Sequence, residues 1–339
     1  MPDAPRVAIS MGDPAGIGPE IVLKALSDPG ASRGLRTVVV GDLSLLRTTA
    51  TACGLDIELH PTAPDAWPDD GVGVIDLANI GAGQVAPGQA SAAGGQAAWE
   101  YIDAATRLCT SGQADVLVTA PINKYSLELA GRGHEGHTEM LMEMTGSPWS
   151  MTVFLLDAMR VAFYSRHLSL AQAIAAIDAE EICEQLVRLA GSASTLGLTD
   201  PLIGVAALNP HAGENGLFGR EEIEEIEPGI AAASARGIRV EGPVPADAIF
   251  HQAREGRYDA VLGLYHDQVS AVLKAIDFHR VVSVTLGLPF LRLSVDHGTA
   301  FDIAGTNSAD PRNMIETLVR TRVALASPAN APDPERESA

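Results

Sequence analysis

The sequence has few cysteines, few aromatic residues and little positive charge. Its cysteines, Cys53, Cys109 and Cys183, stand far apart and form no CxxC pair. This spacing argues against structural disulfides and cysteine-rich zinc sites, and it agrees with a reducing compartment. Only 23 residues are Lys or Arg, against 43 Asp and Glu, which gives a formal net charge of -20. Nucleic acids and anionic membranes bind basic surfaces, so we expect neither as a partner.

The sequence also lacks a long apolar run. No uninterrupted run reaches membrane-spanning length, and the first residues show no basic flank followed by an apolar signal core. We therefore expect a cytoplasmic protein. A chain of 339 residues exceeds one ordinary hydrophobic core, which predicts two domains. A hydrophobic content of 46% with only 4% aromatics is typical of an α/β enzyme built on aliphatic side chains.

Short apolar runs alternate with longer amphipathic stretches, which predicts an α/β fold with a largely parallel sheet. The runs that we expect to form strands are 6–11, 36–42, 55–60, 73–78, 115–121, 151–156, 160–165, 202–208 and 258–264, with 151–156 and 160–165 paired as a hairpin. Residues 81–95 are rich in Gly, Ala and Gln, which predicts a flexible connection or a flap. The acidic run 220–227 predicts a solvent-exposed helix face.

Two segments at predicted helix starts are candidate anion sites. The glycine-rich stretch 12–20 follows the first predicted strand, but it matches neither the dinucleotide fingerprint nor the P-loop pattern. It is either a phosphate-binding loop or a tight turn. In the second segment, His137 and Thr138 precede an apolar helix, and we expect Thr138 to be its N-cap. That segment is either a phosphate cradle or an ordinary cap beside a surface histidine.

Charged side chains are concentrated between short apolar runs in the stretch 263–305. They include His266, Asp267, Lys274, Arg292 and Asp302. His266 and Asp267 directly follow the predicted strand 258–264, and ligands of open α/β sheets bind at the carboxyl ends of strands. A single pair would only suggest a strand cap beside a solvated residue. Several charged strand ends in one stretch predict a functional site.

Three histidines each follow a strand-like run, namely His167, His211 and His266. Taken singly, each is more often structural than functional. Together they form a candidate divalent-metal site of three imidazoles with open coordination positions. Their separations are far longer than in a local motif such as HExxH, so the sequence by itself leaves open whether they meet.

A series of longer motifs makes the chain comparable to a known family. They are MGDPAGIGPE (11–20), APINK (120–124), GHTEML (136–141), ALNPHAGENGLFGREE (207–222), PAD (245–247), YHDQ (265–268), TLGLPFLR (285–292) and DHGTAFDIAG (296–305). In this order and spacing they resemble the 4-hydroxythreonine-4-phosphate dehydrogenase family of pyridoxal phosphate (pyridoxine) biosynthesis. The resemblance covers residues 6–326.

The resemblance implies a two-domain α/β fold like that of the isocitrate and isopropylmalate dehydrogenases, with the active site in the interdomain cleft. We accordingly expect a discontinuous first domain, residues 1–125 plus 298–326, and a second domain, residues 126–297, with the metal and substrate ligands and the dimer contacts. Residues 327–339 have the composition of a disordered tail. The resemblance also implies a homodimer whose subunits share the active site.

The resemblance assigns roles to individual residues. The three histidines match the family's divalent-metal ligands, one of them supplied by the partner subunit. The substrate-binding positions are His137, Thr138, Lys274, Ser283 and Arg292. A loop similar to the one that holds the adenosine end of NAD in the isopropylmalate relatives contains His297, Gly298, Thr299 and Asp302. Candidate catalytic residues are Lys274, Asp247 and Asp267; either carboxylate would accept a proton or orient a ligand histidine.

The implied reaction is an oxidation, with decarboxylation, of 4-phosphohydroxy-L-threonine to 3-amino-2-oxopropyl phosphate. It would use NAD or NADP and one divalent ion, which the sequence does not choose among zinc, cobalt, magnesium and manganese. The alternatives are the same chemistry on D-threonate or D-erythronate 4-phosphate, or on a cyclohexadiene diol derived from terephthalate. An acyl or phosphoryl transferase and a non-catalytic binding protein are further alternatives. The three histidines and the motif at 296–305 argue against the transferase.

The chain departs from the family pattern on the substrate side. The Asn that the family carries before TLGLP is Ser283 here, the Gly that follows YHDQ is Val269, and Leu293 replaces a Thr. Val strongly disfavours positive φ, so we expect a glycine-like turn at 269 to be altered. These changes suggest a paralogue with a different substrate. The retained Arg292 and Lys274 favour a phosphorylated acid over the diol.

Overall fold

The computed structural model describes residues 4–68, 71–81, 83–133 and 136–325. By their contacts they divide into unit 1, which runs to Ser150 and resumes at Leu288–Leu325, and unit 2, Met151–Gly287. We expected boundaries at 125/126 and 297/298. The contacts extend unit 1 at both points, because the helices that follow residue 123 pack on an earlier helix and the strand before residue 296 joins its sheet. The expected tail at 327–339 lies outside the described residues.

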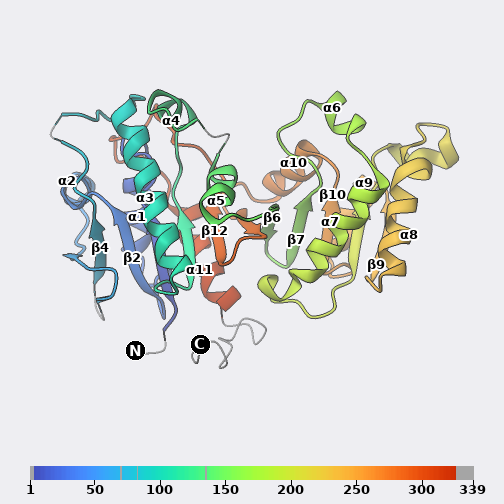
Figure 1. Cartoon of the computed structure of the whole chain (residues 1–339), viewed down its shortest axis with the longest axis horizontal. Helices are drawn as coiled ribbons and strands as arrows, with labels where there is room; N and C mark the ends of the chain where they lie inside the picture. Colours follow the sequence, from blue (N-terminus) through green and yellow to red (C-terminus); the bar gives the residue numbers. More distant parts are fainter. Residues whose placement is uncertain (1–3, 69–70, 82, 134–135, 326–339) are drawn as a thin grey trace. The chain divides into compact units, whose positions relative to one another are not determined.

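Unit 1 is built on a parallel sheet with the strand order β3-β4-β2-β1-β5-β12 (Figure 1). Its strands are β1 (Arg6–Ser10), β2 (Arg36–Gly41), β3 (Leu59–Pro61), β4 (Val72–Asp76), β5 (Val116–Thr119) and β12 (Leu291–Val295). The central strands are almost wholly apolar and inaccessible to solvent, as expected for parallel strands covered on both faces. The predicted strand at 55–60 is shorter and later, because only Leu59–Pro61 pairs with β4.

The helices of unit 1 follow its strands along the chain, some after short loops and others after longer connections. They are α1 (Gly18–Leu26), α2 (Leu43–Cys53), α3 (Ala92–Thr110), α4 (Lys124–Leu129), α5 (His137–Thr145) and α11 (Arg312–Leu325). Asp42, Ser91 and Asn123 cap α2, α3 and α4 by accepting hydrogen bonds from backbone N–H groups in the first turn. The loops between strand ends and helix starts therefore gather at the carboxyl edge of this sheet.

Unit 2 has a mixed sheet with the order β11-β6-β7-β10-β8-β9. Its strands are β6 (Met151–Leu156), β7 (Met159–Phe163), β8 (Ile203–Ala206), β9 (Val240–Val244), β10 (Ala260–Gly263) and β11 (Val282–Leu286). The antiparallel pairing of β6 with β7 confirms the predicted hairpin, and β11 also runs antiparallel to β6. From β7 to β9 the neighbouring strands are parallel. The expectation of a largely parallel α/β fold is thus confirmed.

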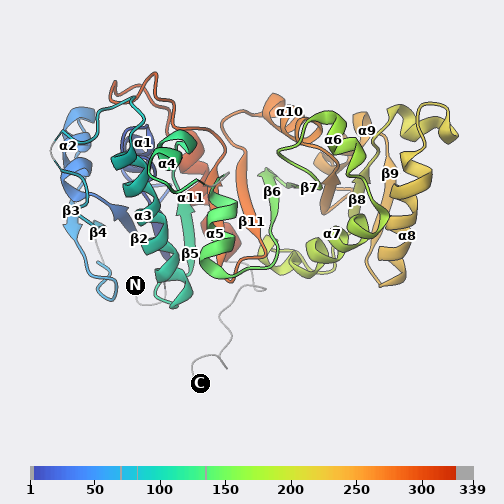
Figure 2. The same ribbon diagram turned by 45° about the horizontal axis from the view of Figure 1, so that its top comes forward.

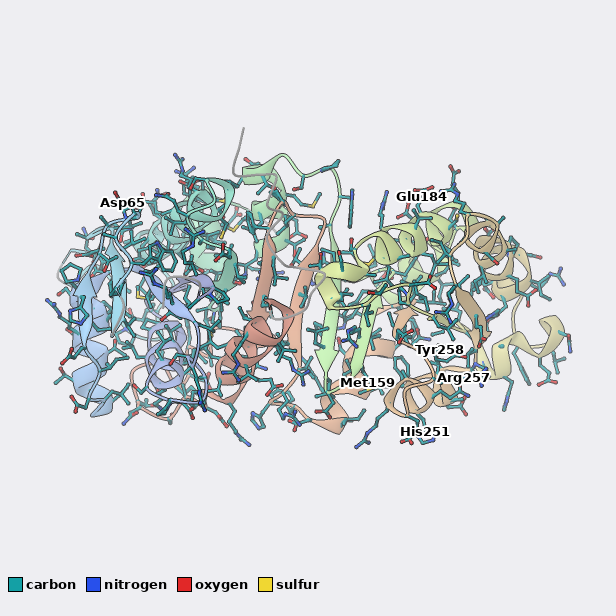
Figure 3. All side chains as sticks on the ribbon, turned by 90° about the horizontal axis from the view of Figure 1, so that it is seen from below. Asp65, Met159, Glu184, His251, Arg257 and Tyr258 are labelled. Carbon is teal, nitrogen blue, oxygen red and sulfur yellow. The ribbon has the colours of Figure 1, made fainter. Side chains whose placement is uncertain are left out.

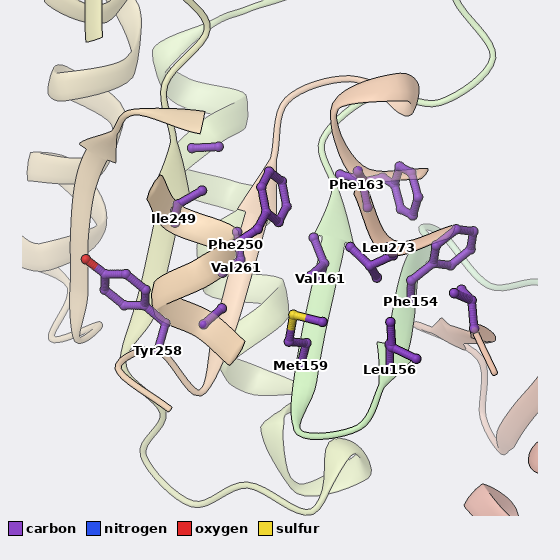
Figure 4. Close-up of a cluster of buried hydrophobic side chains, with 14 residues drawn as sticks. Phe154, Leu156, Met159, Val161, Phe163, Ile249, Phe250, Tyr258, Val261 and Leu273 are labelled. Carbon is purple, nitrogen blue, oxygen red and sulfur yellow. The ribbon is translucent and has the colours of Figure 1, made fainter. Parts of the chain in front are cut away.

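The helices of unit 2 connect these strands (Figure 2). They are α6 (Leu170–Ala175), α7 (Ala179–Gly191), α8 (Glu227–Ala235), α9 (Ala246–Arg254) and α10 (His266–Ile276), with the short turns η1 (Ala193–Leu196), η2 (Pro210–Gly216) and η3 (Glu222–Ile226). In the core, Phe154 and Phe163 meet edge to face at 4.7 Å between ring centroids (Figure 4). Val269 and Leu273 of α10 belong to the same buried cluster.

The edge strand β9 is held by polar contacts from the loop before β10. Glu241 accepts hydrogen bonds from Arg257 at 3.0 Å and from the hydroxyl of Tyr258 at 3.3 Å. The guanidinium of Arg257 also lies 5.4 Å from the centre of the Tyr258 ring (Figure 3). These contacts tie β9, the edge strand in the order β7-β10-β8-β9, to the loop that precedes β10.

Two predictions about connecting segments change with the structure. Gly88, within the expected flap, donates its N–H to the carbonyl of Ala15, and α3 already begins at Ala92, so this part of 81–95 is anchored. The acidic run 220–227 is solvent-facing in part only, because Glu222 is 1% exposed. No helix among the described residues is long and apolar enough to cross a membrane.

Candidate active site

The three histidines follow three neighbouring parallel strands of unit 2. His167 comes after β7, His266 after β10 and His211 after β8, and these strands are adjacent in the order β7-β10-β8. Parallel neighbours end at the same edge of a sheet, where α/β proteins bind their ligands. The strand order thus supplies what the spacing in the sequence left open: all three histidines lie at one edge of one sheet.

His266 has the hydrogen bonding typical of a metal-binding histidine. It is the first residue of α10, and its Nδ1 lies 2.7 Å from Oδ1 of Asp267. A carboxylate that accepts from Nδ1–H leaves Nε2 with a free lone pair, which is how such ligands are held in metal sites. The nearest polar contact of Nε2 is a long one, 3.4 Å to the hydroxyl of Ser270. The His167 ring centre is 6.5 Å from that of His266, close enough for a shared ion after a small side-chain adjustment.

The three histidine side chains do not meet at one point within a single chain. Among the described residues no group of three His, Cys, Asp or Glu side chains is arranged to hold a metal ion. His167, His211 and His266 are exposed, and the His211 ring contacts Phe218 at 6.3 Å between centroids. A three-histidine centre therefore needs a ligand from a second copy of the chain or a rotation of these exposed side chains. The donor set itself, imidazoles with one carboxylate beside His266, fits a divalent ion.

In unit 1, a buried cation lies beside a partly buried imidazole. Arg292 on β12 is 4% exposed, and its Nε and Nη2 lie 3.2 and 2.5 Å from the hydroxyl oxygen of Thr119 on β5. His137 opens α5, and its Nε2 is buried without a hydrogen-bond partner among the described residues. Burial first, and then the charge of Arg292, hold the pKa of His137 well below its usual value, so the ring is neutral near pH 7. These groups suit an anion with several oxygens.

The expected N-cap of this helix is wrong by two positions. Gly136 is the N-cap of α5, with an extended φ of 170°, and Thr138 lies buried inside the first turn. Glycine offers no side-chain oxygen to the first N–H groups, so this helix start has no side-chain cap. Uncapped N–H groups at a helix start attract anions, and the backbone N–H groups of His137 and Thr138 belong to this helix start.

The loop that was expected to bind the cofactor packs against the glycine-rich turn. Thr299 is 7% exposed, and its carbonyl accepts from the N–H of Ile17 at 3.0 Å. A Cβ on Gly16 would lie 2.9 Å from Cβ of Thr299, so glycine is needed for this approach. His297 binds the adjacent Gly298 carbonyl through Nδ1 at 3.0 Å. Asp302 is exposed.

Two acidic residues that the sequence did not single out support this loop region. Asp13 is buried; its Oδ1 accepts from the N–H of Ala15 at 2.9 Å, and burial raises its pKa despite that bond. Glu20 on α1 accepts from Lys24 at 2.7 Å and from the N–H of Ala309 at 2.8 Å. Both belong to the motif at 11–20, so the glycine-rich stretch acts as a tight turn that anchors residues 299–309.

The remaining predicted residues lie in unit 2. Lys274 is partly buried on α10, with Nζ 5.6 Å from the centre of the Phe278 ring. Asp247 is exposed in the first turn of α9. Ser283 is 8% exposed on β11.

The expected disturbance at Val269 does not occur. Val269 is a helical residue of α10 and is fully buried, so its position demands no positive φ. A Cβ on Gly263 would lie 2.3 Å from Cγ2 of Val269, which means that the valine packs against a glycine at the end of β10. The β-branched side chain therefore fills core space beside the strand that leads to His266.

Comparison with known proteins agrees with these observations. Residues 34–320 match the family model described as pyridoxal phosphate biosynthetic protein PdxA. The chain belongs to this family. A curated relative from Symbiobacterium thermophilum, named "Putative D-threonate 4-phosphate dehydrogenase", is 44% identical over 94% of this chain and 96% of its own length. The recognition of the family from its motifs is confirmed, and the family assigns the chain to the dehydrogenases that act on CH–OH groups.

Solved structures show the same relationship. The crystal structure of a 4-hydroxythreonine-4-phosphate dehydrogenase from Klebsiella pneumoniae superposes with a TM-score of 0.87 at 38% identity, covering 95% of this chain and 98% of the other. A terephthalate 1,2-cis-dihydrodiol dehydrogenase from Burkholderia xenovorans gives a TM-score of 0.62 at 30% identity, covering 92% and 97%. The two-unit α/β architecture is thus that of the PdxA dehydrogenases.

Proposed function

We propose that the protein is an NAD- and divalent-metal-dependent dehydrogenase of a four-carbon hydroxy acid phosphorylated on carbon 4. The observation that carries this proposal is the placement of His167, His211 and His266 after three adjacent parallel strands. The substrates that fit are 4-phosphohydroxy-L-threonine and D-threonate 4-phosphate, and D-erythronate 4-phosphate has the same chemistry. Relatives are named for D-threonate 4-phosphate and for 4-hydroxythreonine 4-phosphate.

The residues of unit 2 would serve the oxidation itself. The three imidazoles would hold a divalent ion, which would supply a Lewis acid for the substrate hydroxyl, and bound NAD would supply the hydride acceptor. Asp267 would accept from Nδ1–H of His266, 2.7 Å away, and so leave Nε2 for the ion. Asp247 is exposed at the start of α9 and is the candidate to accept the hydroxyl proton. Lys274 supplies positive charge, which favours loss of carbon dioxide from the β-keto product.

The residues of unit 1 would bind the anionic group. The guanidinium of Arg292 would supply the positive charge for the anion, and Nε2 of His137 has no partner among the described residues. The N-terminus of α5 adds backbone N–H groups at Thr138. The terephthalate diol carries carboxylates but no phosphate, so it would leave the phosphate contacts of this arrangement unused. The adenosine end of NAD would be held by His297, Gly298, Thr299 and Asp302.

We further propose a homodimer that completes the metal site. Large apolar side chains are exposed close to two of the histidines. After His167, Leu168 and Leu170 are 46% and 58% exposed, and beyond the turn of His211, Leu217 and Phe218 are 72% and 52% exposed. Contiguous exposed apolar surface marks association sites. A second copy that covers it would bring its own histidine to the edge of this sheet.

Activity is therefore expected to fall on dilution in step with dissociation of the dimer. The measurement is specific activity over a dilution series, set beside sedimentation velocity at the same concentrations and with metal and NAD saturating. A monomer with full activity per chain would remove the shared site.

The substrate proposal is tested by NADH formation over a panel of compounds. The panel contains 4-phosphohydroxy-L-threonine, D-threonate and D-erythronate 4-phosphates, their unphosphorylated forms, and the terephthalate diol, each with and without divalent metal. We expect metal-dependent turnover of a phosphorylated acid and at least about 100-fold lower kcat/KM without the phosphate, since charged hydrogen bonds are lost. Turnover of the diol alone, or no turnover of any compound, would contradict the proposal.

Ser283→Asn is the matched variant for this panel. Ser283 is 8% exposed on β11 and stands where the family carries Asn. If Ser283 marks a changed substrate, the variant gains activity on 4-phosphohydroxy-L-threonine and loses it on the native acid, because specificity is a difference of transition-state affinities. If the variant loses activity on both compounds alike, Ser283 affects only packing. In that case 4-phosphohydroxy-L-threonine is retained as the proposed substrate.

A further inference from the structure

The turn that carries His211 has an unusual backbone. Six successive residues of η2 have positive φ: His211 at 53°, Ala212 at 53°, Gly213 at 76°, Glu214 at 44°, Asn215 at 57° and Gly216 at 88°. For residues other than glycine this left-handed conformation costs about 1–2 kcal/mol each. Such a run persists only where surrounding contacts impose it, and it is typical of functional sites.

Glu222 provides these contacts at the base of the turn. Its Oε1 accepts from the backbone N–H of Leu208 at 2.9 Å and of Asn209 at 2.7 Å, and its Oε2 accepts from the side-chain amide of Asn209 at 2.8 Å. The side chain is 1% exposed. A buried carboxylate is costly unless donors surround it, and here three N–H groups from the two residues before the turn do so.

The turn also closes directly over this carboxylate. A Cβ on Gly213 would lie 2.9 Å from Oε2 of Glu222, so only glycine allows the backbone to pass there. The carbonyl of Gly213 accepts from the N–H of Phe218 at 3.1 Å, and that of Glu214 accepts from the N–H of Leu217 at 3.2 Å. Both the entry and the middle of the turn are thus set by Glu222.

Among the neighbouring acidic residues, Glu221 also accepts from the side-chain amide of Asn209, at 2.7 Å, but the backbone N–H groups of Leu208 and Asn209 donate to Glu222. Glu224 is exposed and pairs with Arg220 on the surface, and Glu225 caps α7 by accepting from the N–H of Ala179 at 3.0 Å. Glu222 instead begins η3, a π-helical turn, and such turns often accompany functional sites. The extra residue of a π-helical turn changes which side chains face inward. In η3, the side chain of Glu222 faces the turn that carries His211.

We propose that Glu222 is a positioning residue that fixes the backbone of the turn from which His211 reaches the metal ion. The inference rests on the proposed metal site. It adds that the affinity of this site depends on a buried carboxylate that is not itself a ligand, acting through the backbone of 208–213.

The test compares Glu222→Gln with Glu224→Gln in the full-length protein. Gln keeps the shape of Glu222, but its amide nitrogen donates and cannot accept from the side-chain amide of Asn209. At least one of the three hydrogen bonds to Glu222 is therefore lost. We measure hydrogen exchange of the Leu208 and Asn209 amides without metal, and the affinity for Co²⁺ by its visible absorption. We expect exchange at 208–217 to be about tenfold faster and Co²⁺ affinity to be about 10- to 100-fold weaker. Glu224→Gln should change neither.

The outcomes separate this inference from the proposed function. Unchanged exchange, or faster exchange with unchanged Co²⁺ affinity, overturns the role of Glu222 and leaves the metal site standing. A wild-type protein that binds no divalent ion overturns both. If Glu222→Gln does not fold, Glu222→Asp is measured instead. Asp keeps the charge on a shorter side chain. For the inference to hold, the Co²⁺ affinity of this variant must be weaker than that of the wild type but still measurable.

Discussion

Replacing His211 with Ala is expected to abolish turnover while leaving unit 2 folded. Loss of a residue that merely supports a ligand already costs about 10- to 100-fold in metal affinity or activity, so loss of a ligand should cost more than about 100-fold. Stability should change by no more than about 0.5 kcal/mol, as for other surface positions, because His211 is exposed. Ala has the same Cβ as His, so the strain of φ at 53° is not relieved. The measurements are kcat/KM, Co²⁺ affinity and thermal unfolding without metal.

The matched control is His251→Ala. His251 is an exposed histidine of the last turn of α9 in the same unit (Figure 3). It follows no strand end, so its removal should leave turnover and Co²⁺ affinity unchanged. A near-native rate for His211→Ala after treatment with a chelator would show that the three-histidine site is wrong.

The second large effect is expected for Arg292→Lys. Lys keeps the positive charge but not the planar fork that meets two oxygens of a carboxylate or phosphate. The loss of charged hydrogen bonds is worth about 2–3 kcal/mol, or roughly 30- to 150-fold in kcat/KM for a phosphorylated substrate. The loss should be much smaller for a substrate analogue without that anionic group. Equal losses with both compounds would show that Arg292 acts on the fold and not on the anion.

Two further measurements sharpen this test. Arg107→Lys is the control, because Arg107 is exposed on α3 and pairs with Asp103 on the same helix. Arg292→Gln removes the charge that helps to lower the pKa of His137, so the pKa of that imidazole should rise in the variant, as followed by NMR. An unchanged pKa would mean that the two side chains do not interact.

The sequence by itself determined the fold class, the family and the candidate residues of the site. Strand and helix periodicity depends on near neighbours, so the alternation of elements and the hairpin of β6 and β7 could be recognised locally. The position of each histidine after an apolar run is likewise a local property. The motifs then identified the PdxA family, because long matches in a fixed order are specific.

Only the tertiary structure decided which of these residues come together. The order β7-β10-β8 depends on contacts between distant segments, and no local pattern specifies it. Arg292 meets Thr119 across 173 positions of sequence. The sequence likewise misplaced Val269, because the family glycine suggested a turn where α10 in fact continues. Burial, which arises from such contacts, also made Glu222 a support of the His211 turn although its acidic neighbours predicted a solvent-facing helix. Local pattern gives the type of each element, whereas long-range packing sets the environment of each side chain.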